Sequence, residues 1–375
     1  MRIGIEAQRI FREKKHGMDI YAVELIKELQ QIDHENEYFI FVKPDKDWCI
    51  EETHNFSIIE VFGVTYADWE QISLPIAASK YELDVLHCTS NTAPLFCPVP
   101  TIVTLHDIIY LNKNFSGGSL YQRLGHYYRK WIVPLAYKKA KQVFTVSNFE
   151  RDRITALLGH ENKLQTVYNG VGGKFKPLNS EEQKETRARL NLPKQYLFFL
   201  GNTAPKKNMK GMLEAFSRYC DENKDALPLV IAESSEEDVI SILYDLKRTD
   251  VIEKIHLTGY LFHHDLPSVY ASAALFIYPS LRESFGIPII EAMACGAPVI
   301  TSQASSMPEV AGEAACLVNP NKPIEIAQAI SLILEDETYY QNLRAKGALR
   351  AVDFRWSSTA EKVSASYLEA ELVKV

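Results

Sequence analysis

The chain lacks the long apolar runs that a membrane-spanning helix needs. Hydrophobic residues make up 46% of its 375 positions, yet no run approaches roughly 18 consecutive apolar residues. The stretch "VYASAALFIY" is about half that length and is interrupted by small residues. The first residues, "MRIGIEAQRI", are too short and too polar for the apolar core of a signal peptide. These absences predict a cytoplasmic protein.

Signatures of metal binding and of several nucleotide-binding classes are also missing. The six cysteines are Cys49, Cys88, Cys97, Cys220, Cys295 and Cys316. They show neither a C-x-x-C pair nor a cysteine–histidine metal spacing, so small apolar roles in a reducing compartment are expected, without a metal. No strand is followed by G-x-G-x-x-G or by G-x-x-x-x-G-K-[ST], which argues against a dehydrogenase and a P-loop enzyme. The formal net charge of -7 argues against a nucleic-acid partner.

What the sequence does contain is a regular alternation of two kinds of segment. Short β-branched or aromatic runs alternate with helix-length amphipathic segments, which is typical of parallel βαβ units. The pattern occurs twice, and the glycine-rich stretch "NGVGGKFKPLN" at 169–179 separates the halves. The sequence therefore predicts an α/β protein with two Rossmann-like, doubly wound domains facing a cleft. Because ligands of such sheets bind at the carboxyl ends of the strands, the strand-to-helix turns are the places to search.

The most informative of these turns is "RESFGIPIIEAMACG", Arg282–Gly296. A helix from about Ile287 would present backbone N–H groups to an anion, and Gly286 would let a phosphate approach the chain closely. Glu283 before the helix and Glu291 inside it bracket this anion site, where a carboxylate can accept hydrogen bonds from the vicinal hydroxyls of a ribose or a hexose. The alternative for Glu291 is a glutamate that only complements the helix dipole.

Three other turns carry polar candidates. Lys206 and Lys207 follow an apolar strand in "GNTAPKKNMKG"; they can reach a phosphate as point charges, or form a solvated surface pair. His106 ends another strand and can bond a sugar hydroxyl or transfer a proton, whereas Asp107 after it can equally cap the next helix. Gly17 precedes the first helix and can bring a phosphate against backbone N–H groups.

The segment 113–141 is basic and aromatic in an otherwise acidic chain. No acidic residue occurs between Asp107 and Glu150. Its basic residues are Lys113, Arg123, Arg129, Lys130, Lys138, Lys139 and Lys141, with Tyr121, Tyr127, Tyr128 and Trp131 among them. Such a composition predicts contact with an anionic membrane or with a diphospho-lipid acceptor. An ordinary surface helix with a buried aromatic face is the alternative.

Taken together, these motifs resemble family 4 of the retaining glycosyltransferases. "PSLRESFGIPIIEAMACGAPVITS" is similar to the E-x7-E signature of that family. The resemblance covers nearly the whole chain, including "VTLHDIIYL", "VYNGV", "GNTAPKKNMKGMLEAF", "HLTGY" and "FRWSSTAEK". It implies the GT-B fold, with a nucleotide-sugar donor domain over 175–355. It also implies an acceptor domain over 1–174, completed by a final helix at 356–375.

The resemblance further implies roles for individual residues. Donor-binding roles are implied for Gly17, Asn202, Lys206, Lys207, Thr258, Gly259, Tyr260, Glu283, Ser284, Phe285, Gly286, Ile287 and Glu291. Catalytic roles are implied for His106, Lys207 and Glu283. Glu291 would hold the ribose, Glu283 would lie beside the donor sugar, and Lys207 would neutralise the diphosphate. His106 would lie near the hydroxymethyl group and the anomeric carbon of the transferred sugar.

Three departures from the family pattern bear on these roles. Asn202 stands where many members have arginine, so one diphosphate contact is weaker or is supplied by Lys206. Ser284 replaces the first glycine of the usual E-G-F-G and can crowd or hydrogen-bond the sugar. Gly17 stands without the second glycine that is common in the family, which weakens its assignment to phosphate.

The function that the resemblance implies is transfer of a hexose from a nucleotide-diphosphate sugar to an acceptor hydroxyl, with retention of configuration and without a metal. The expected acceptor is a glycan or a lipid-linked glycan in polysaccharide synthesis, with the protein cytoplasmic or peripheral on the inner face of the membrane. Two alternatives are a GT-B nucleotide-sugar epimerase and a nucleotide-sugar binding module without turnover.

Overall fold

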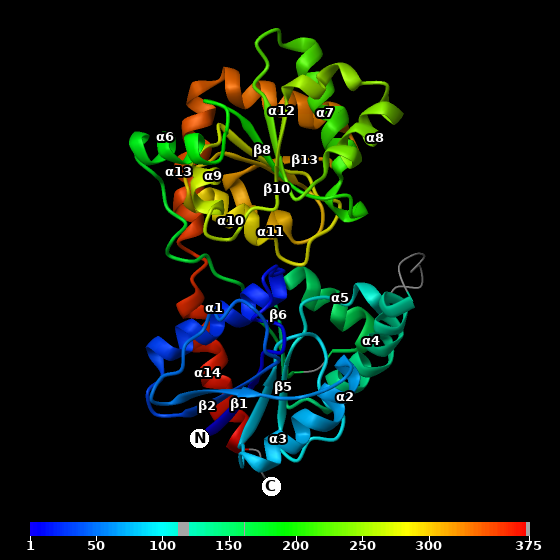
Figure 1. Cartoon of the computed structure of the whole chain (residues 1–375), viewed down its shortest axis with the longest axis vertical. Coiled ribbons are helices and arrows are strands. Elements are labelled where there is room, and N and C mark those ends of the chain that lie inside the picture. The colour runs from blue at the N-terminus through cyan, green and yellow to red at the C-terminus, as the bar shows by residue number, and fades with distance from the viewer. Residues whose placement is uncertain (112–119, 161, 373–375) are drawn as a thin grey trace. The chain divides into compact units, whose positions relative to one another are not determined.

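The computed structural model describes residues 1–111, 120–160 and 162–372, which form two compact units (Figure 1). Unit 1 comprises Met1–Gly170 and Trp356–Val375, and unit 2 comprises Val171–Arg355. The first boundary lies at residue 170, where the sequence predicted 174. The final helix belongs to unit 1, and its expected last residues, 373–375, lie outside the described residues.

Unit 1 is built on a single parallel sheet. Its elements in chain order are β1 (Arg2–Glu6), α1 (Gly17–Ile32), β2 (Glu37–Val42), β3 (Phe56–Glu60), α2 (Tyr66–Asp68), the π-helical turn η1 (Trp69–Ser73), α3 (Leu74–Lys80), β4 (Val85–Cys88), β5 (Thr101–Thr104), the 3-10 turn η2 (Ile109–Leu111), α4 (Leu120–Lys139), β6 (Gln142–Thr145), α5 (Asn148–Leu158), β7 (Leu164–Thr166) and α14 (Trp356–Leu372). In the described part, the strand order is β3-β2-β1-β4-β5-β6-β7.

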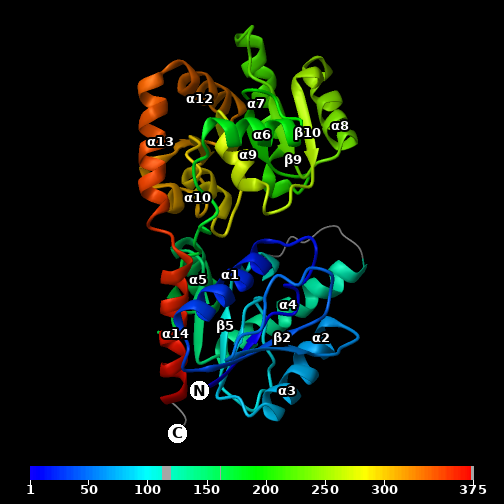
Figure 2. The same cartoon turned by 60° about the vertical axis from the view of Figure 1, so that its left-hand side comes forward.

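Helices cover both faces of the unit 1 sheet because alternate strand residues point to opposite sides. On one face, Leu86 of β4 packs with Trp69 of η1 and Tyr137 of α4. On the other face α1 lies beside α14 (Figure 2). There, the His87 ring of β4 is hydrogen-bonded to the Tyr367 hydroxyl of α14 at 2.8 Å. The C-terminal helix is therefore part of the core of the unit that begins the chain.

Unit 2 repeats the same architecture with a second parallel sheet. Its elements are α6 (Ser180–Arg189), β8 (Leu197–Leu200), the 3-10 turn η3 (Pro205–Lys207), α7 (Met209–Glu222), β9 (Leu229–Ala232), α8 (Glu236–Leu246), the 3-10 helix η4 (Thr249–Lys254), β10 (Ile255–Gly259), α9 (Leu266–Ser272), β11 (Leu275–Tyr278), α10 (Ile287–Ala294), β12 (Val299–Ser302), α11 (Met307–Ala311), the 3-10 turn η5 (Gly312–Ala314), β13 (Cys316–Val318), α12 (Pro323–Glu335) and α13 (Glu337–Ala351). The strand order is β10-β9-β8-β11-β12-β13.

The two faces of the unit 2 sheet bury separate sets of side chains. Leu197 and Phe199 of β8 pack in an apolar cluster with α7, α8 and α12. Phe198, between them, points the other way and meets Tyr270 of α9, whose ring also contacts Phe276 of β11. Helices α9 and α10 therefore lie on the face opposite α7. This division matters for the candidate site, which lies at β8 and β11. The chain continues from β8 into α7 on one face and from β11 into α10 on the other.

Candidate functional site

The candidate site lies at the carboxyl ends of β8 and β11, neighbours in the middle of the unit 2 sheet. The strand order runs β10-β9-β8 in one direction and β11-β12-β13 in the other, so it reverses between these two strands. The loops after them diverge, because one leads into α7 and the other into α10. Open α/β sheets bind ligands at such a reversal point.

Asn208 fastens these two loops to each other. It adopts a left-handed conformation, with φ of 57°. Its Nδ2 donates to the carbonyl oxygens of Pro279 at 3.0 Å and Pro320 at 2.7 Å. A Cβ on Gly211 would lie 2.5 Å from the Asn208 side chain, so glycine is needed there for the asparagine to fold back. As a result the loop that carries the two lysines is held against the loop of the E-x7-E motif.

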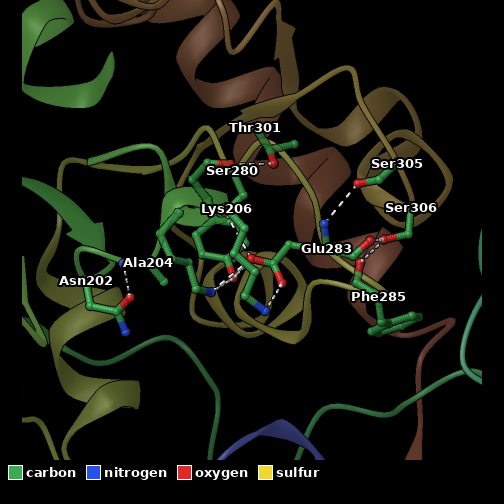
Figure 3. A network of polar contacts seen from close by, with 11 residues as sticks. Asn202, Ala204, Lys206, Ser280, Glu283, Phe285, Thr301, Ser305 and Ser306 are labelled. Atoms are coloured by element: carbon green, nitrogen blue, oxygen red, sulfur yellow. Dashed lines mark hydrogen bonds and ion pairs between the residues drawn. The ribbon is translucent and has the colours of Figure 1, made fainter. Parts of the chain in front are cut away.

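The structure brings Lys206, Lys207 and Glu283 together in this pair of loops. Figure 3 shows Lys206 beside the Glu283 carboxylate. Lys207 Nζ donates to Glu283 Oε1 at 2.9 Å and to the Tyr278 hydroxyl at 2.6 Å. Glu283 Oε1 also accepts from the Tyr278 hydroxyl at 2.8 Å and from Ser280 Oγ at 3.0 Å. Lys206 Nζ lies farther away, 3.9 Å from Oε2. Oε1 of Glu283 thus accepts from three side chains. Among the described residues, Oε2 has only the ammonium group of Lys206, the more exposed lysine, beside it.

The surroundings of Glu283 keep this carboxylate charged. Burial by itself would raise the pKa of Glu283, but the ammonium groups of Lys207 and Lys206, with the hydrogen bonds from Lys207 and Tyr278, outweigh burial and hold the pKa below its usual value. The pKa of Tyr278 is raised well above its usual value by burial and by the Glu283 charge. The Tyr278 hydroxyl therefore stays protonated and continues to donate to Glu283.

The start of α10 is shaped by Gly286 and by Ser306. Gly286 has φ of 102°, and a Cβ there would lie 3.0 Å from Ile289 Cδ1, so conformation and space both favour glycine. Ser306 Oγ donates to the carbonyl oxygens of Glu283 and Phe285, at 2.9 Å each. The backbone amide of Ile289 already donates to Gly286 O at 3.0 Å. The anion site predicted at the N-terminus of α10 therefore has fewer available backbone N–H groups than the sequence suggested.

Glu291 lies inside α10, 4% exposed, and its carboxylate makes only long contacts. His263 Nε2 lies 3.4 Å from Oε1, and the Tyr270 hydroxyl donates to Oε2 at 3.3 Å. Such lengths are beyond those of strong hydrogen bonds to a carboxylate. This buried carboxylate therefore retains hydrogen-bonding capacity, in contrast to Oε1 of Glu283.

Thr258, Gly259 and Tyr260 lie at the end of β10, the edge strand of the unit 2 sheet. Gly259 has φ of 67° and its carbonyl accepts from the backbone amide of Glu233 at 2.8 Å. Thr258 and Tyr260 line a cavity of about 370 Å³ together with Asp265 and the chain at 190–192. These three residues thus lie two strands away from β8 and three from β11, the strands that carry the lysine–glutamate cluster.

His106 lies in unit 1, two residues beyond the end of β5, which stops at Thr104 instead of continuing to His106 as the sequence predicted. Its Nε2 lies 2.9 Å from the carbonyl oxygen of Thr89. Because a carbonyl can only accept, Nε2 carries the proton and Nδ1 is the acceptor of the neutral ring. Burial lowers the pKa of His106 to about 4. Asp107 accepts from the Ile109 amide at 3.0 Å and so caps the turn η2.

Gly17 begins α1 in unit 1, and the first turn of this helix already contains a carboxylate. Asp19, 3% exposed, accepts from the backbone amide of His16 at 2.9 Å and forms an ion pair of 3.1 Å with Arg9. A Cβ built on Gly17 meets nothing within 4 Å. The contact of Gly17 with phosphate stays a prediction, and the Asp19 charge opposes it.

Sequence reasoning missed four side chains that contact the carboxylates of the motif glutamates. Tyr278 and Ser280 contact Glu283, and His263 and Tyr270 contact Glu291. Tyr278 and Ser280 lie four and two positions before the start of "RESFG", so a polar atom at the end of an apolar strand was an available signal. No pattern pointed to the other two. Asn202, also expected here, uses its Oδ1 to accept from the Ala204 amide at 3.0 Å.

Two further features concern metals and membranes. Within 1–111, 120–160 and 162–372, no three histidine, cysteine, aspartate or glutamate side chains group closely enough to hold a metal ion. Among the helices of those same residues, none combines the length and the apolar character needed to cross a bilayer.

Comparison with known proteins places this geometry in a family. Residues 16–172 match the model "Glycosyltransferase Family 4", and residues 180–350 match "Glycosyl transferases group 1". The O-antigen chain mannosyltransferase B of Escherichia coli is 32% identical over 233 residues, which are 61% of this chain and 60% of that protein. The chain therefore spans less than two thirds of this curated relative.

Solved structures show the same fold at lower identity. Sucrose-phosphate synthase from Thermosynechococcus elongatus superposes with a TM-score of 0.76 at 19% identity, over 98% of each chain. Anabaena HepE, solved in complex with UDP and glucose, has a TM-score of 0.75 at 16% identity, over 98% of this chain and 99% of that one. The two Rossmann-like units expected of the GT-B fold are confirmed by these likenesses. The chain belongs to family 4 of the glycosyltransferases.

Proposed function

We propose that the protein is a retaining glycosyltransferase that moves a hexose from a nucleoside-diphosphate sugar to an acceptor hydroxyl without a metal ion. The observation that carries this proposal is the Lys207–Glu283 pair beside the N-terminus of α10, at the point where the strand order of unit 2 reverses. Cations, a helix N-terminus and carboxylates with spare acceptor capacity match the diphosphate and the hydroxyls of such a donor.

In this proposal each group of the site binds one part of the donor. Lys206 and Lys207 hold the diphosphate together with the start of α10. Glu291 accepts hydrogen bonds from the ribose hydroxyls. Its contacts to His263 and Tyr270 are long, so its carboxylate retains the capacity to do so. Glu283 Oε2, which lies 3.9 Å from Lys206 Nζ, receives a hydroxyl of the sugar.

The chemistry needs charge stabilisation more than a protein nucleophile. The bond between the anomeric carbon and the diphosphate oxygen breaks, and the acceptor oxygen bonds to the same face of that carbon. The acceptor proton passes to the leaving phosphate oxygen. Lys206, Lys207 and the helix N-terminus neutralise the charge that builds on the diphosphate, an effect that contributes several kcal/mol in a preorganised site.

Relatives support an acceptor in glycan synthesis. The name of O-antigen chain mannosyltransferase B refers to a glycan, the O-antigen chain, and to the transfer of mannose. HepE was solved with UDP and glucose. The proposed acceptor is therefore a growing polysaccharide or a lipid-linked glycan. An epimerase would instead release a product without any acceptor-derived part, and a binding module would turn over no donor.

The first experiment is a thermal-shift screen of nucleotide sugars, followed by transfer assays with the donor that stabilises the protein. A ligand at about 100 times its Kd adds about 2.7 kcal/mol to the free energy of unfolding. Lys207→Ala is expected to lower kcat by about 100-fold or more. It is also expected to lower the melting temperature, because the buried Glu283 carboxylate loses its ion-pair partner, while circular dichroism is expected to show that the chain still folds. Lys210→Ala is the matched control, because Lys210 is an exposed lysine of the same turn region.

Two further readouts test the finer parts of the proposal. Activity is expected to survive a chelator, and full dependence on added metal would contradict the metal-free reaction. The anomeric proton coupling of the product, read by NMR, is expected to match that of the donor sugar. A kcat of Lys207→Ala within tenfold of the wild-type value would show that Lys207 does not contribute to the reaction as proposed.

A further inference from the structure

The outer side of α4 in unit 1 carries large apolar side chains in the open. We call the α4 apolar face the set Leu124, Tyr127, Trp131 and Leu135. Their exposed fractions are 61%, 55%, 73% and 45% in that order. Spacings of three, four and four residues place them along one stripe of the helix. The opposite stripe, with Val133, Ala136 and Tyr137, is at most 3% exposed and packs on the sheet.

Basic residues flank this face on both sides. At about 100° per residue, Arg123 and Lys130 lie along one edge of the face, Lys139 lies along the other, and Lys138 lies within it. All four are exposed. The sequence contains no acidic residue from 108 to 149. Lys113 and the rest of 113–119 in the basic segment lie outside the described residues. An apolar centre with cationic edges is complementary to a surface of lipid tails and anionic headgroups.

One apolar side chain of a neighbouring segment, Phe96, extends the exposed area. Phe96 is 81% exposed, and the ammonium group of Lys139 lies 4.3 Å from the centre of its ring. The area is therefore larger than one helical stripe, and contiguous exposed apolar patches of this kind mark interaction sites.

The inner side of α4 is fixed to η1, so the face is presented by a rigid element. The Tyr128 hydroxyl of α4 donates to the buried carboxylate of Glu70 in η1. Gln71 Nε2 donates to the same hydroxyl at 2.8 Å and to the carbonyl oxygen of Ala93 at 3.1 Å. A preformed surface loses little conformational entropy when it meets a partner.

We propose that the α4 apolar face rests on an anionic lipid bilayer. The aromatic and aliphatic side chains enter the headgroup region, and the flanking lysines and arginine meet lipid phosphates. A second copy of the chain is a poor occupant, because two such faces would bring their cationic edges together without a compensating charge. This contact goes beyond glycosyl transfer and does not depend on it.

The test is flotation of the full chain with vesicles of phosphatidylcholine mixed with equal phosphatidylglycerol, and with phosphatidylcholine alone. The chain is expected to float with the anionic vesicles at low salt and to be released at high salt. Trp131→Ser is expected to lower the partition coefficient about tenfold. The double substitution Arg123→Gln/Lys130→Gln is expected to lower it about fivefold for each charge removed.

Matched controls come from unit 2. Leu349→Ser removes a side chain that is 74% exposed, and Lys224→Gln removes an exposed charge; both are expected to float like the wild type. Circular dichroism and melting temperature are expected to be unchanged in every variant. Equal flotation with neutral vesicles, or normal flotation of Trp131→Ser, would overturn the proposal. A wild-type dimer that Trp131→Ser converts to monomer would make a second copy the occupant instead.

Discussion

At the scale of single residues, His106 and Glu283 show how burial sets the charge of a candidate catalytic group. Burial disfavours the charged form of both side chains. Two lysines compensate at Glu283, whose pKa is lowered. At His106 the Thr89 carbonyl and the Asp107 charge favour protonation, but burial dominates and lowers the pKa to about 4. Glu283 is therefore an anion and His106 a neutral ring at physiological pH, which favours hydrogen bonding over proton transfer for His106.

The pH dependence of stability follows from the His106 pKa. The unfolded chain binds a proton on this histidine below about 6.5, whereas the folded chain does so only below about 4. Between these values the unfolded state holds more protons, so the free energy of unfolding falls as the pH falls. His106 is expected to contribute about 3 kcal/mol of this loss.

NMR titration of the histidine ring carbons checks this expectation directly. The His106 signal is expected to keep its neutral position, with the proton on Nε2, from neutral pH down to about pH 5. Denaturant titrations of His106→Asn at several pH values are expected to show a shallower pH slope than the wild type. A ring that titrates near pH 6.5 would contradict the lowering of the His106 pKa by burial.

At the scale of elements, the site depends on how two loops are joined. The strands β8 and β11 pair in parallel, and Leu281 N donates to Lys206 O at 2.8 Å where the loops leave them. Asn208 adds two side-chain hydrogen bonds to carbonyl oxygens of other loops. The position of Lys207 against Glu283 is thus a property of the loop pair and not of either segment alone.

Substitution of Asn208 tests this coupling. Asn208→Ala removes both hydrogen bonds and leaves a left-handed backbone on alanine, so a loss of about 2–3 kcal/mol in the free energy of unfolding is expected. Asn208→Gly removes the backbone strain but does not restore the hydrogen bonds. Its free energy of unfolding is therefore expected to be about 1 kcal/mol higher than that of Asn208→Ala. Both variants are expected to lose transfer activity, because Lys207 is displaced. Urea unfolding and kcat supply the two readouts; wild-type kcat in Asn208→Ala would refute the coupling.

At the scale of the whole molecule, the chain leaves unit 1 at Gly170 and returns to it at Trp356. The returning helix α14 contributes Trp356, Val363 and Tyr367 to the core, each at most 3% exposed. Thr359 Oγ1 also donates to the carbonyl oxygen of Tyr168 at 2.6 Å. Helix α14 is therefore part of the core of unit 1.

A substitution near the C-terminus is expected to destabilise the unit that contains the N-terminus. Tyr367→Ala removes a buried ring and its hydrogen bond to His87, and a loss of about 3–5 kcal/mol is expected. Leu368→Ala, at a neighbouring position that is 53% exposed, is expected to change stability by less than about 0.5 kcal/mol. Hydrogen exchange is expected to speed up in α1 and β4. Faster exchange confined to unit 2 would contradict this assignment of α14.

The sequence by itself determined the architecture and the identity of the family, because hydrophobic periodicity and motif spacing are local properties of the chain. Two parallel sheets, the strand before "RESFG" and the helix from Ile287 were predictable in this way. β13 was not, since its three residues, Cys316–Val318, are too few to show a period. Ser284, singled out as a departure from the family pattern, keeps an unassigned role.

Tertiary structure alone decided which atoms meet and which groups are charged. Lys207 and Glu283 are 76 positions apart in the chain, and only the pairing of β8 with β11 brings them to 2.9 Å. The Tyr278 hydroxyl between them, the long contacts of Glu291 and the low pKa of His106 likewise depend on packing. Local pattern cannot specify such contacts, because hydrogen bonds and burial are set by segments that are distant in sequence.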